Sequence, residues 1–231
     1  MYPIIYKIGP LNIYSWGFMV AVAFLVGLIT ALRYAKKEGI RAEIILDLFI
    51  YVTIISIIGA RFFYVIQFFS QFKDNLISIF YVWQGGLVFL GGLLFALAVI
   101  LAYVKYHKLD IWKLLDVLSP ATAIGYAIGR IGCFLNGCCY GIALFGIQQP
   151  TQIYSSISGL IIFLVLAYVY NKKRYSGQIF LFALLLYSVY RFLIEFLRYS
   201  PYHILVFTPS QAMVAIVFVF SLYALWKKST T

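Results

Sequence analysis

The stretch Gly129-Arg130-Ile131-Gly132-Cys133-Phe134-Leu135-Asn136-Gly137-Cys138-Cys139-Tyr140-Gly141 ends a long apolar run that begins at Leu114. This run carries one full charge, Arg130. A guanidinium keeps its proton, so its placement at membrane depth costs at least a few kcal/mol. A carboxylate, main-chain carbonyls, water or an anionic ligand must offset that cost. The run therefore predicts a membrane helix that holds either a structural ion pair or an anion site.

The composition of the whole chain is that of a membrane protein with several spans. Of its 231 residues, 64% are hydrophobic and 11% are charged. That length allows roughly seven spans of about 20 residues with short loops. We predict an all-α integral membrane protein with seven transmembrane helices and a single transmembrane domain, residues 1–231. The net charge of +11 would indicate a nucleic acid partner in a soluble protein, but here most basic residues lie in short loops, so we expect none.

The distribution of charge between the apolar runs predicts the orientation in the membrane. The predicted spans are residues 13–32, 44–69, 81–103, 114–137, 154–170, 179–197 and 205–226. Lysine and arginine follow the first, third, fifth and seventh spans, whereas the loop 138–152 has neither. Because basic loops stay in the cytoplasm, we expect the N-terminus outside and the C-terminus inside. Residues 1–11 are interpreted as an interfacial arm with aromatic anchors.

Three of the predicted spans carry an arginine at a similar depth: Arg61, Arg130 and Arg191. Glu195 lies one helical turn after Arg191 and is the carboxylate expected at this depth. One carboxylate cannot neutralise three arginines. The glycine pairs 85–86 and 91–92 fall at the same depth and allow close approach of a backbone or a ligand. We therefore expect an outward-facing cationic cavity, suited to a phosphate because arginine forms bidentate contacts with it. A set of structural ion pairs is the alternative.

The three cysteines of the chain lie close together in the sequence, at Cys133, Cys138 and Cys139. We expect them to pack as small hydrophobic residues. Zinc would need four ligands, and the two histidines, His107 and His203, fall in loops on opposite sides of the predicted membrane. We therefore expect no metal. A disulfide between Cys133 and either of the other two stays open.

Several motifs together resemble the signature of the prolipoprotein diacylglyceryl transferase family. The central one is Gly129-Arg130-x-Gly132-x-Phe134-x-Asn136-Gly137. Further matching motifs occur in the family's order: Ile8-Gly9-Pro10-Leu11, Trp16-Gly17, Gly59-Ala60-Arg61-x-x-Tyr64, Trp83-x-Gly85-Gly86-x-x-Phe89-x-Gly91-Gly92, Pro150-Thr151-Gln152-x-Tyr154 and Arg191-Phe192-x-x-Glu195-x-x-Arg198. The resemblance extends over nearly the whole chain.

The resemblance implies an enzyme of the bacterial plasma membrane. It would transfer the diacylglyceryl group of phosphatidylglycerol to the lipobox cysteine of a prolipoprotein, without a metal or an organic cofactor. The implied catalytic residues are Arg130 and Arg191, which bind the phosphate, and Glu195, which orients Arg191 or relays a proton. The implied lipid-binding set adds Arg61, Asn136, Gly137, Tyr140 and Arg198. Taken by itself, Arg198 fits an interfacial cation whose charge reaches water.

Three positions depart from the family pattern. Cys133 stands where the family usually has asparagine, Cys138 where it has glutamate, and Leu90 where it has histidine or tyrosine. A leucine accepts no proton, so another group must take it, and a thiolate of Cys133 or Cys138 is a candidate. Two other functions stay open: a divergent paralogue that alkylates another acceptor, and an anionic-lipid binding or transport protein that lost the chemistry.

Overall fold

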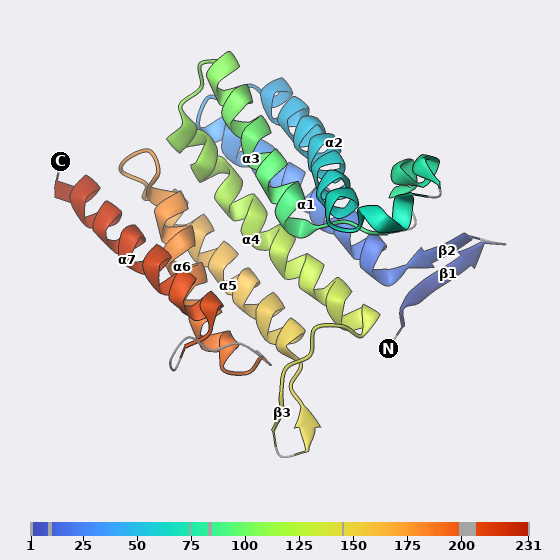
Figure 1. The fold of residues 1–231 in the computed structure, drawn as a ribbon. Helices are drawn as coiled ribbons and strands as arrows, with labels where there is room; N and C mark the ends of the chain where they lie inside the picture. The colour runs from blue at the N-terminus through green and yellow to red at the C-terminus, as the bar shows by residue number, and fades with distance from the viewer. Residues whose placement is uncertain are drawn as a thin grey trace. The chain divides into compact units, whose positions relative to one another are not determined.

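The computed structural model describes residues 2–8, 11–73, 75–82, 85–144, 146–198 and 207–230. Seven α-helices in this part of the chain are long and apolar enough to cross a membrane, which confirms the predicted fold class. They are α1 (Ser15–Lys37), α2 (Ala42–Gln67), α3 (Phe89–Tyr106), α4 (Ile111–Asn136), α5 (Thr151–Tyr170), α6 (Gln178–Glu195) and α7 (Pro209–Thr230), shown in Figure 1. Gly9, Pro10, Trp83 and His203, which the sequence analysis used, lie outside the described residues.

The chain divides into two compact units. The first comprises residues 1–34 and 112–231, with α1 and α4 to α7, and the second comprises residues 35–111, with α2 and α3. The second unit also holds two short 3-10 helices, η1 (Phe69–Phe72) and η2 (Leu76–Phe80). The expectation of a single domain stays a prediction.

Close helix packing in the first unit depends on glycine. A side chain at Gly132 of α4 would come within 2.9 Å of Met19 in α1. A side chain at Gly159 of α5 would come within 3.0 Å of the Tyr126 ring in α4. Small residues at such contacts let membrane helices approach each other. Helix α6 packs against both α5 and α7, so α4, α5 and α6 are adjacent in space as well as in the sequence.

A buried aspartate ties α4 to the start of α6. Asp116 is fully buried and accepts hydrogen bonds from the N–H groups of Gly177 at 2.7 Å and Phe180 at 2.9 Å. The Lys173 ammonium lies 2.9 Å from the same carboxylate. Asp116 precedes Arg130 by 14 residues, or roughly 21 Å along a helix. The Asp116 carboxylate therefore interacts with Lys173 and the start of α6, far from Arg130.

In the second unit, α3 begins at Phe89 and not at residue 81 as predicted. Gly85 and Gly86 have φ angles of +87° and +72°, a region that glycine adopts at little cost. The chain is therefore not helical there. A side chain at Gly86 would come within 2.6 Å of the Tyr64 ring and 2.7 Å of the Arg61 guanidinium. Close approach is thus observed at Gly86, but to side chains of α2, and not to the backbone or ligand predicted for this glycine pair.

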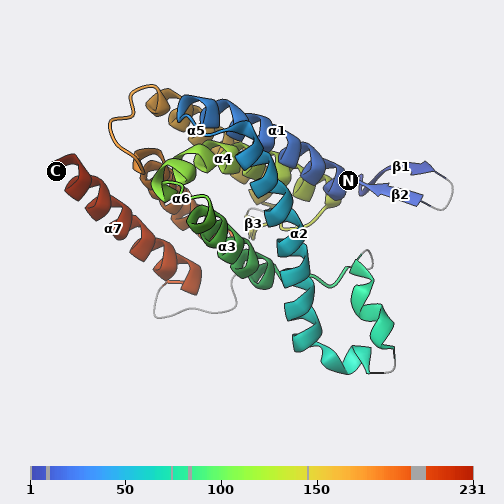
Figure 2. The ribbon, with the colours of Figure 1, turned by 90° about the horizontal axis from the view of Figure 1, so that it is seen from above.

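The N-terminal arm is an antiparallel hairpin of β1 (Ile4–Ile8) and β2 (Leu11–Tyr14) that precedes α1 (Figure 2). The Tyr2 N–H donates to the Leu135 carbonyl at 3.2 Å, close to the end of α4. Tyr2, Tyr6 and Tyr14 are exposed, as expected of interfacial aromatic anchors. A second hairpin, β3 (Ala143–Leu144) and β4 (Ile147–Gln148), lies between α4 and α5.

Candidate functional site

Arg130 is half-buried in the last third of α4. Its guanidinium carbon lies 5.0 Å from the centroid of the Tyr126 ring, one helical turn earlier. A cation over an aromatic face gains about 0.5–2 kcal/mol, which is less than the several kcal/mol lost when a charge leaves water. Within the described part of the chain, no carboxylate pairs with Arg130. No described carboxylate therefore balances its charge.

A chain of hydroxyl groups fixes the Tyr126 ring. The Tyr126 hydroxyl lies 3.1 Å from that of Tyr190 in α6. The Tyr190 hydroxyl donates to Ser155 Oγ of α5 at 2.5 Å, and Ser155 donates to the Thr151 carbonyl at 2.6 Å. A carbonyl can only accept, so Ser155 donates its proton to Thr151 and Tyr190 must donate its proton to Ser155. Tyr126 is therefore the donor in its hydrogen bond with Tyr190. Three helices thus hold the ring on which Arg130 rests.

Arg191 of α6 has a carboxylate partner, as predicted. Arg191 NH2 lies 3.0 Å from Glu195 Oε2, and Glu195 is 6% exposed. Glu195 Oε1 accepts a hydrogen bond from Thr208 Oγ1 at 3.1 Å. The Gln211 side chain in turn accepts from the Thr208 N–H at 2.9 Å. Thr208 thus hydrogen-bonds one carboxylate oxygen, and the other faces the Arg191 charge as an ion pair without a hydrogen bond.

Three arginines of the first unit converge on one tyrosine. The Tyr187 hydroxyl is within electrostatic range of Arg191, Arg130 and Arg198. The rings of Tyr126, Tyr187 and Tyr190 pack with their centroids 6.0 to 6.3 Å apart. We call these six residues the arginine–tyrosine cluster. It carries three positive charges, and among the described residues only Glu195 is paired with any of them.

Helix α4 ends immediately after this cluster because of Gly137. Gly137 has a φ angle of +77°, and its N–H donates to the Phe134 carbonyl at 3.1 Å. The Cys138 N–H donates back to the Cys133 carbonyl at 3.2 Å. These two bonds form the Schellman arrangement that glycine favours at helix ends. Cys138 is thereby folded over Cys133.

The loop after α4 is fixed by the first turn of α5. Thr151 Oγ1 donates to the Cys139 carbonyl at 2.8 Å, and Gln152 Nε2 donates to the Cys138 carbonyl. A side chain at Gly141 would collide with the Leu197 carbonyl and the Thr151 methyl group. The loop is therefore held against both α5 and the end of α6.

The residues predicted to shape the outer site have different environments. Asn136 is exposed at the end of α4, and Gly137 provides the helix end described above. Tyr140 is half-buried, and its ring centroid lies 6.5 Å from that of Phe134. Leu90, which replaces the family's histidine or tyrosine, is 56% exposed in the first turn of α3.

Arg61 belongs to the second unit and is 7% exposed. Its Nε donates to the Ile79 carbonyl at 2.8 Å, and its NH2 to that of Ser78 at 2.7 Å. Its NH1 donates to the carbonyls of Gly85 at 2.7 Å and Gly86 at 3.1 Å. An arginine side chain has five N–H donors. In Arg61, four of them are hydrogen-bonded to main-chain carbonyls. Arg61 is thus held by main-chain carbonyls, one of the partners expected to offset the cost of an arginine at membrane depth.

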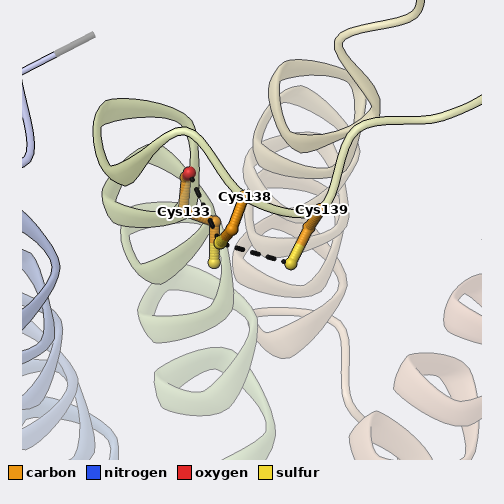
Figure 3. A group of neighbouring side chains, drawn as sticks. All are labelled: Cys133, Cys138 and Cys139. Atoms are coloured by element: carbon orange, nitrogen blue, oxygen red, sulfur yellow. Dashed lines mark hydrogen bonds between the residues drawn. The ribbon is translucent and has the colours of Figure 1, made fainter.

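The three cysteines are free, and their Sγ atoms all lie within 4.8 Å of one another. The Cys139 thiol donates to Cys138 Sγ at 3.4 Å, as Figure 3 shows. Burial raises the pKa of the Cys139 thiol and the neighbouring Cys138 adds to this, while Arg130 and Arg198 lower it. Because the net direction is upward, Cys139 is a neutral thiol near pH 7. It is exposed and Cys133 and Cys138 are half-buried, so the prediction that all three pack as hydrophobic residues does not hold for Cys139.

Sequence reasoning missed the tyrosines and Ser155. A signal for two of them was present, because Tyr126 and Tyr187 each precede an intramembrane arginine by four residues. That spacing places a ring on the same helix face, one turn from the guanidinium. Tyr190 and Ser155 had no such signal, because they reach the cluster only through contacts between helices.

Comparison with known proteins agrees with the motifs. A family model described as prolipoprotein diacylglyceryl transferase matches residues 3–227. The phosphatidylglycerol–prolipoprotein diacylglyceryl transferase of Finegoldia magna is 34% identical over 209 residues, which cover 86% of this chain and 84% of the relative. The protein of that name from Clostridium kluyveri is 34% identical over 86% of this chain and 85% of its own length. The one from Shouchella clausii is 33% identical over 95% and 87%. The chain therefore belongs to the prolipoprotein diacylglyceryl transferase family.

Proposed function

We propose that this protein transfers the diacylglyceryl group of phosphatidylglycerol to the thiol of a lipobox cysteine in a prolipoprotein. The thiolate sulfur attacks the glyceryl carbon that bears the phosphate, a carbon–sulfur bond forms and the carbon–oxygen bond breaks. Glycerol phosphate leaves with the electron pair of the broken bond, and the thiol proton passes to a base. Family membership and the names of the relatives support this choice of substrates.

The observation that carries the proposal is the charge of the arginine–tyrosine cluster. Arg130, Arg191 and Arg198 act together on Tyr187, and Glu195 supplies one negative charge in return. A phosphodiester monoanion would reduce the remaining excess, and the leaving phosphate would gain further negative charge as the carbon–oxygen bond breaks. Fixed donors aimed at a developing charge lower the barrier, and loss of one typically costs about 100- to 1,000-fold in rate.

The residues of the cluster would divide this work. Arg130 and Arg191 are proposed to hold the phosphate oxygens, and Arg198 to add charge at the outer edge. The hydroxyl chain through Tyr126 is a positioning device for Arg130. Glu195 is proposed to position Arg191 through their ion pair, while Thr208 holds the other carboxylate oxygen.

Proton transfer needs a different group. Cys133 and Cys138 occupy the family's asparagine and glutamate positions and are the candidates we retain. Asn136, Gly137 and Tyr140 are proposed to shape the entry for the acceptor peptide, through the ending of α4. Arg61 is proposed to act indirectly, because its carbonyl contacts hold the segment around Gly85 and Gly86.

The acyl chains need an apolar surface close to the cluster. A cavity of about 300 Å³ lies between α6 and α7 and is lined by Ser188, Val189, Phe192, Leu193, Val214, Ala215, Phe218 and Val219. Phe192 directly follows Arg191 in the sequence. We propose that one acyl chain of phosphatidylglycerol occupies this cavity while the headgroup lies at the arginines.

The setting is proposed to be the bacterial plasma membrane, with a single membrane domain. The N-terminus would lie outside and Lys227 and Lys228 inside, which places the end of α4 at the outer face. That side is where the signal peptide of a secreted prolipoprotein presents its lipobox cysteine.

The test is alkylation of a lipobox peptide by the purified protein in vesicles that contain phosphatidylglycerol, with complementation of a strain depleted of its own transferase. We expect peptide that gains the mass of a diacylglyceryl group, with one glycerol phosphate released per peptide. Phosphatidylglycerol binding without product would support the lipid-binding alternative. Product on a different thiol acceptor alone would support the divergent paralogue.

A further inference from the structure

We propose that Cys133, Cys138 and Cys139 form a binding site for a thiophilic metal ion, Cu⁺ or Zn²⁺, at the end of α4. Figure 3 shows the three side chains on the turn that closes the helix, with their sulfur atoms facing one another. A thiolate that ligates a metal cannot also accept the proton of the acceptor thiol, so the metal-bound form excludes Cys133 and Cys138 as the base. The test below therefore measures metal binding alone and does not depend on the transfer reaction.

The distances between the sulfurs suit a three-thiolate site. All three Sγ atoms lie within 4.8 Å of one another, and those of Cys138 and Cys139 are 3.4 Å apart. Three sulfurs at about 2.3 Å from a central ion lie about 4 Å from each other.

The backbone holds the three cysteines in place without a metal. The bond from the Cys138 N–H to the Cys133 carbonyl brings residues five apart into contact. Cys139 has a φ angle of +66°, a left-handed conformation that is uncommon outside glycine. Thr151 and Gln152, both buried in the first turn of α5, bind the carbonyls of Cys139 and Cys138. The strained turn is therefore fixed by its surroundings, as is typical of functional sites.

The donor set selects the class of ion. Thiolates prefer soft ions such as Cu⁺ and Zn²⁺ over Mg²⁺ or Ca²⁺. Zinc was not expected from the sequence because the two histidines cannot supply the missing ligands. Three sulfurs nevertheless suffice, since Cu⁺ accepts three thiolates and a zinc site with three protein ligands takes water as the fourth.

Electrostatics makes the binding dependent on pH. Three thiolates leave a net negative charge after one Cu⁺ or Zn²⁺ binds, and the charges of Arg130 and Arg198, which act on Cys139, offset part of it. Because the thiols must lose their protons, the affinity rises with pH.

The test uses the full-length protein in detergent, reduced and then freed of reductant. Zn²⁺ and Cu⁺ are each titrated in competition with a chromophoric chelator. We expect one ion per chain for at least one of the two metals. X-ray absorption should show three sulfur neighbours at about 2.3 Å. The dissociation constant of each metal is calculated from its competition titration, and the metal with the lower value is the ion that the site prefers.

Serine variants test the ligands one at a time. The chain has only three cysteines, so Cys133→Ser, Cys138→Ser and Cys139→Ser each remove a third of the donor set. We expect each to weaken binding by more than the 10- to 100-fold that loss of an outer-sphere partner typically costs. The triple variant should not bind, while the control His107→Ala should bind as the wild type does.

Three results would overturn the proposal. One is unchanged binding in the triple serine variant, which would place the ion elsewhere. Another is a bound ion with fewer than three sulfur neighbours. The last is the absence of competitive binding of either ion by the fully reduced protein, whose thiol count gives three.

Discussion

The replacement Glu195→Gln separates two roles for the buried carboxylate. Glutamine keeps the shape and an acceptor oxygen for Thr208, but it removes the charge that faces Arg191 at 3.0 Å. Removal of one partner of a buried ion pair costs about 3–5 kcal/mol, and because Arg191 is 19% exposed we take about 1.5–3 kcal/mol for this pair. At about 1.4 kcal/mol for each tenfold change in rate, we expect kcat/KM for lipobox peptide alkylation to fall by about 10- to 100-fold.

The assay records initial rates against phosphatidylglycerol content and across pH 6 to 9. If Glu195 positions Arg191, the KM for phosphatidylglycerol rises and the shape of the pH profile is unchanged. The comparison variant is Thr208→Val, which keeps the Glu195 charge but loses the bond that Thr208 Oγ1 donates to the carboxylate and the one it accepts from the Gln211 N–H. A hydrogen bond to a charged group contributes about 1.5–3 kcal/mol, so we expect its rate to fall by about 10-fold or more, with the acidic limb of the pH profile retained. A Glu195→Gln variant with wild-type KM and without the acidic limb of the pH profile would refute the positioning role and make Glu195 the base.

Three further predictions concern other parts of the chain. In a background without native cysteines, Thr231→Cys should resist impermeant thiol reagents in intact cells, and efficient labelling would reverse the proposed topology. Arg61→Lys should lower the apparent Tm in detergent, because lysine cannot reach the four carbonyls that Arg61 binds; the expected loss is about 2–4 kcal/mol, and an unchanged Tm would contradict it. Alkylation of Cys139 in chelator-treated protein should still accelerate above pH 9, because burial raises its pKa, and a plateau below pH 8 would show a thiolate instead.

The fold could largely be predicted from the sequence. In lipid, an apolar run of about 20 residues must form a helix to satisfy its backbone hydrogen bonds. Each of the seven predicted spans has a helix in the structure. The start of α3 was the exception. The apolar run that includes Leu87 and Val88 does not reveal that Gly85 and Gly86 leave the helical region. Backbone conformation at a glycine pair depends on its neighbours, here Arg61 and Tyr64 of α2.

The candidate site was only partly readable. The Arg191–Glu195 pair follows from helical spacing, and the structure contains it. The contact between Tyr126 and Tyr190 joins residues 64 apart, and no periodicity relates them. The partners of Arg61 are main-chain carbonyls, which every residue carries and no sequence pattern marks. The three cysteines could be identified from the sequence as neighbours. That their sulfur atoms lie together could not be predicted, because it depends on how the chain turns at Gly137.

The central claim is that the Arg130 guanidinium holds the phosphate of phosphatidylglycerol during the transfer. The most direct measurement is the rate of lipobox peptide alkylation by Arg130→Lys in vesicles, at matched protein level. Lysine keeps the charge and loses the bidentate fork, so we predict a loss of about 100-fold or more. The control is Arg174→Lys, an exposed arginine outside the spans, which should leave the rate unchanged. A wild-type rate for Arg130→Lys would contradict the account and make Arg130 a structural residue.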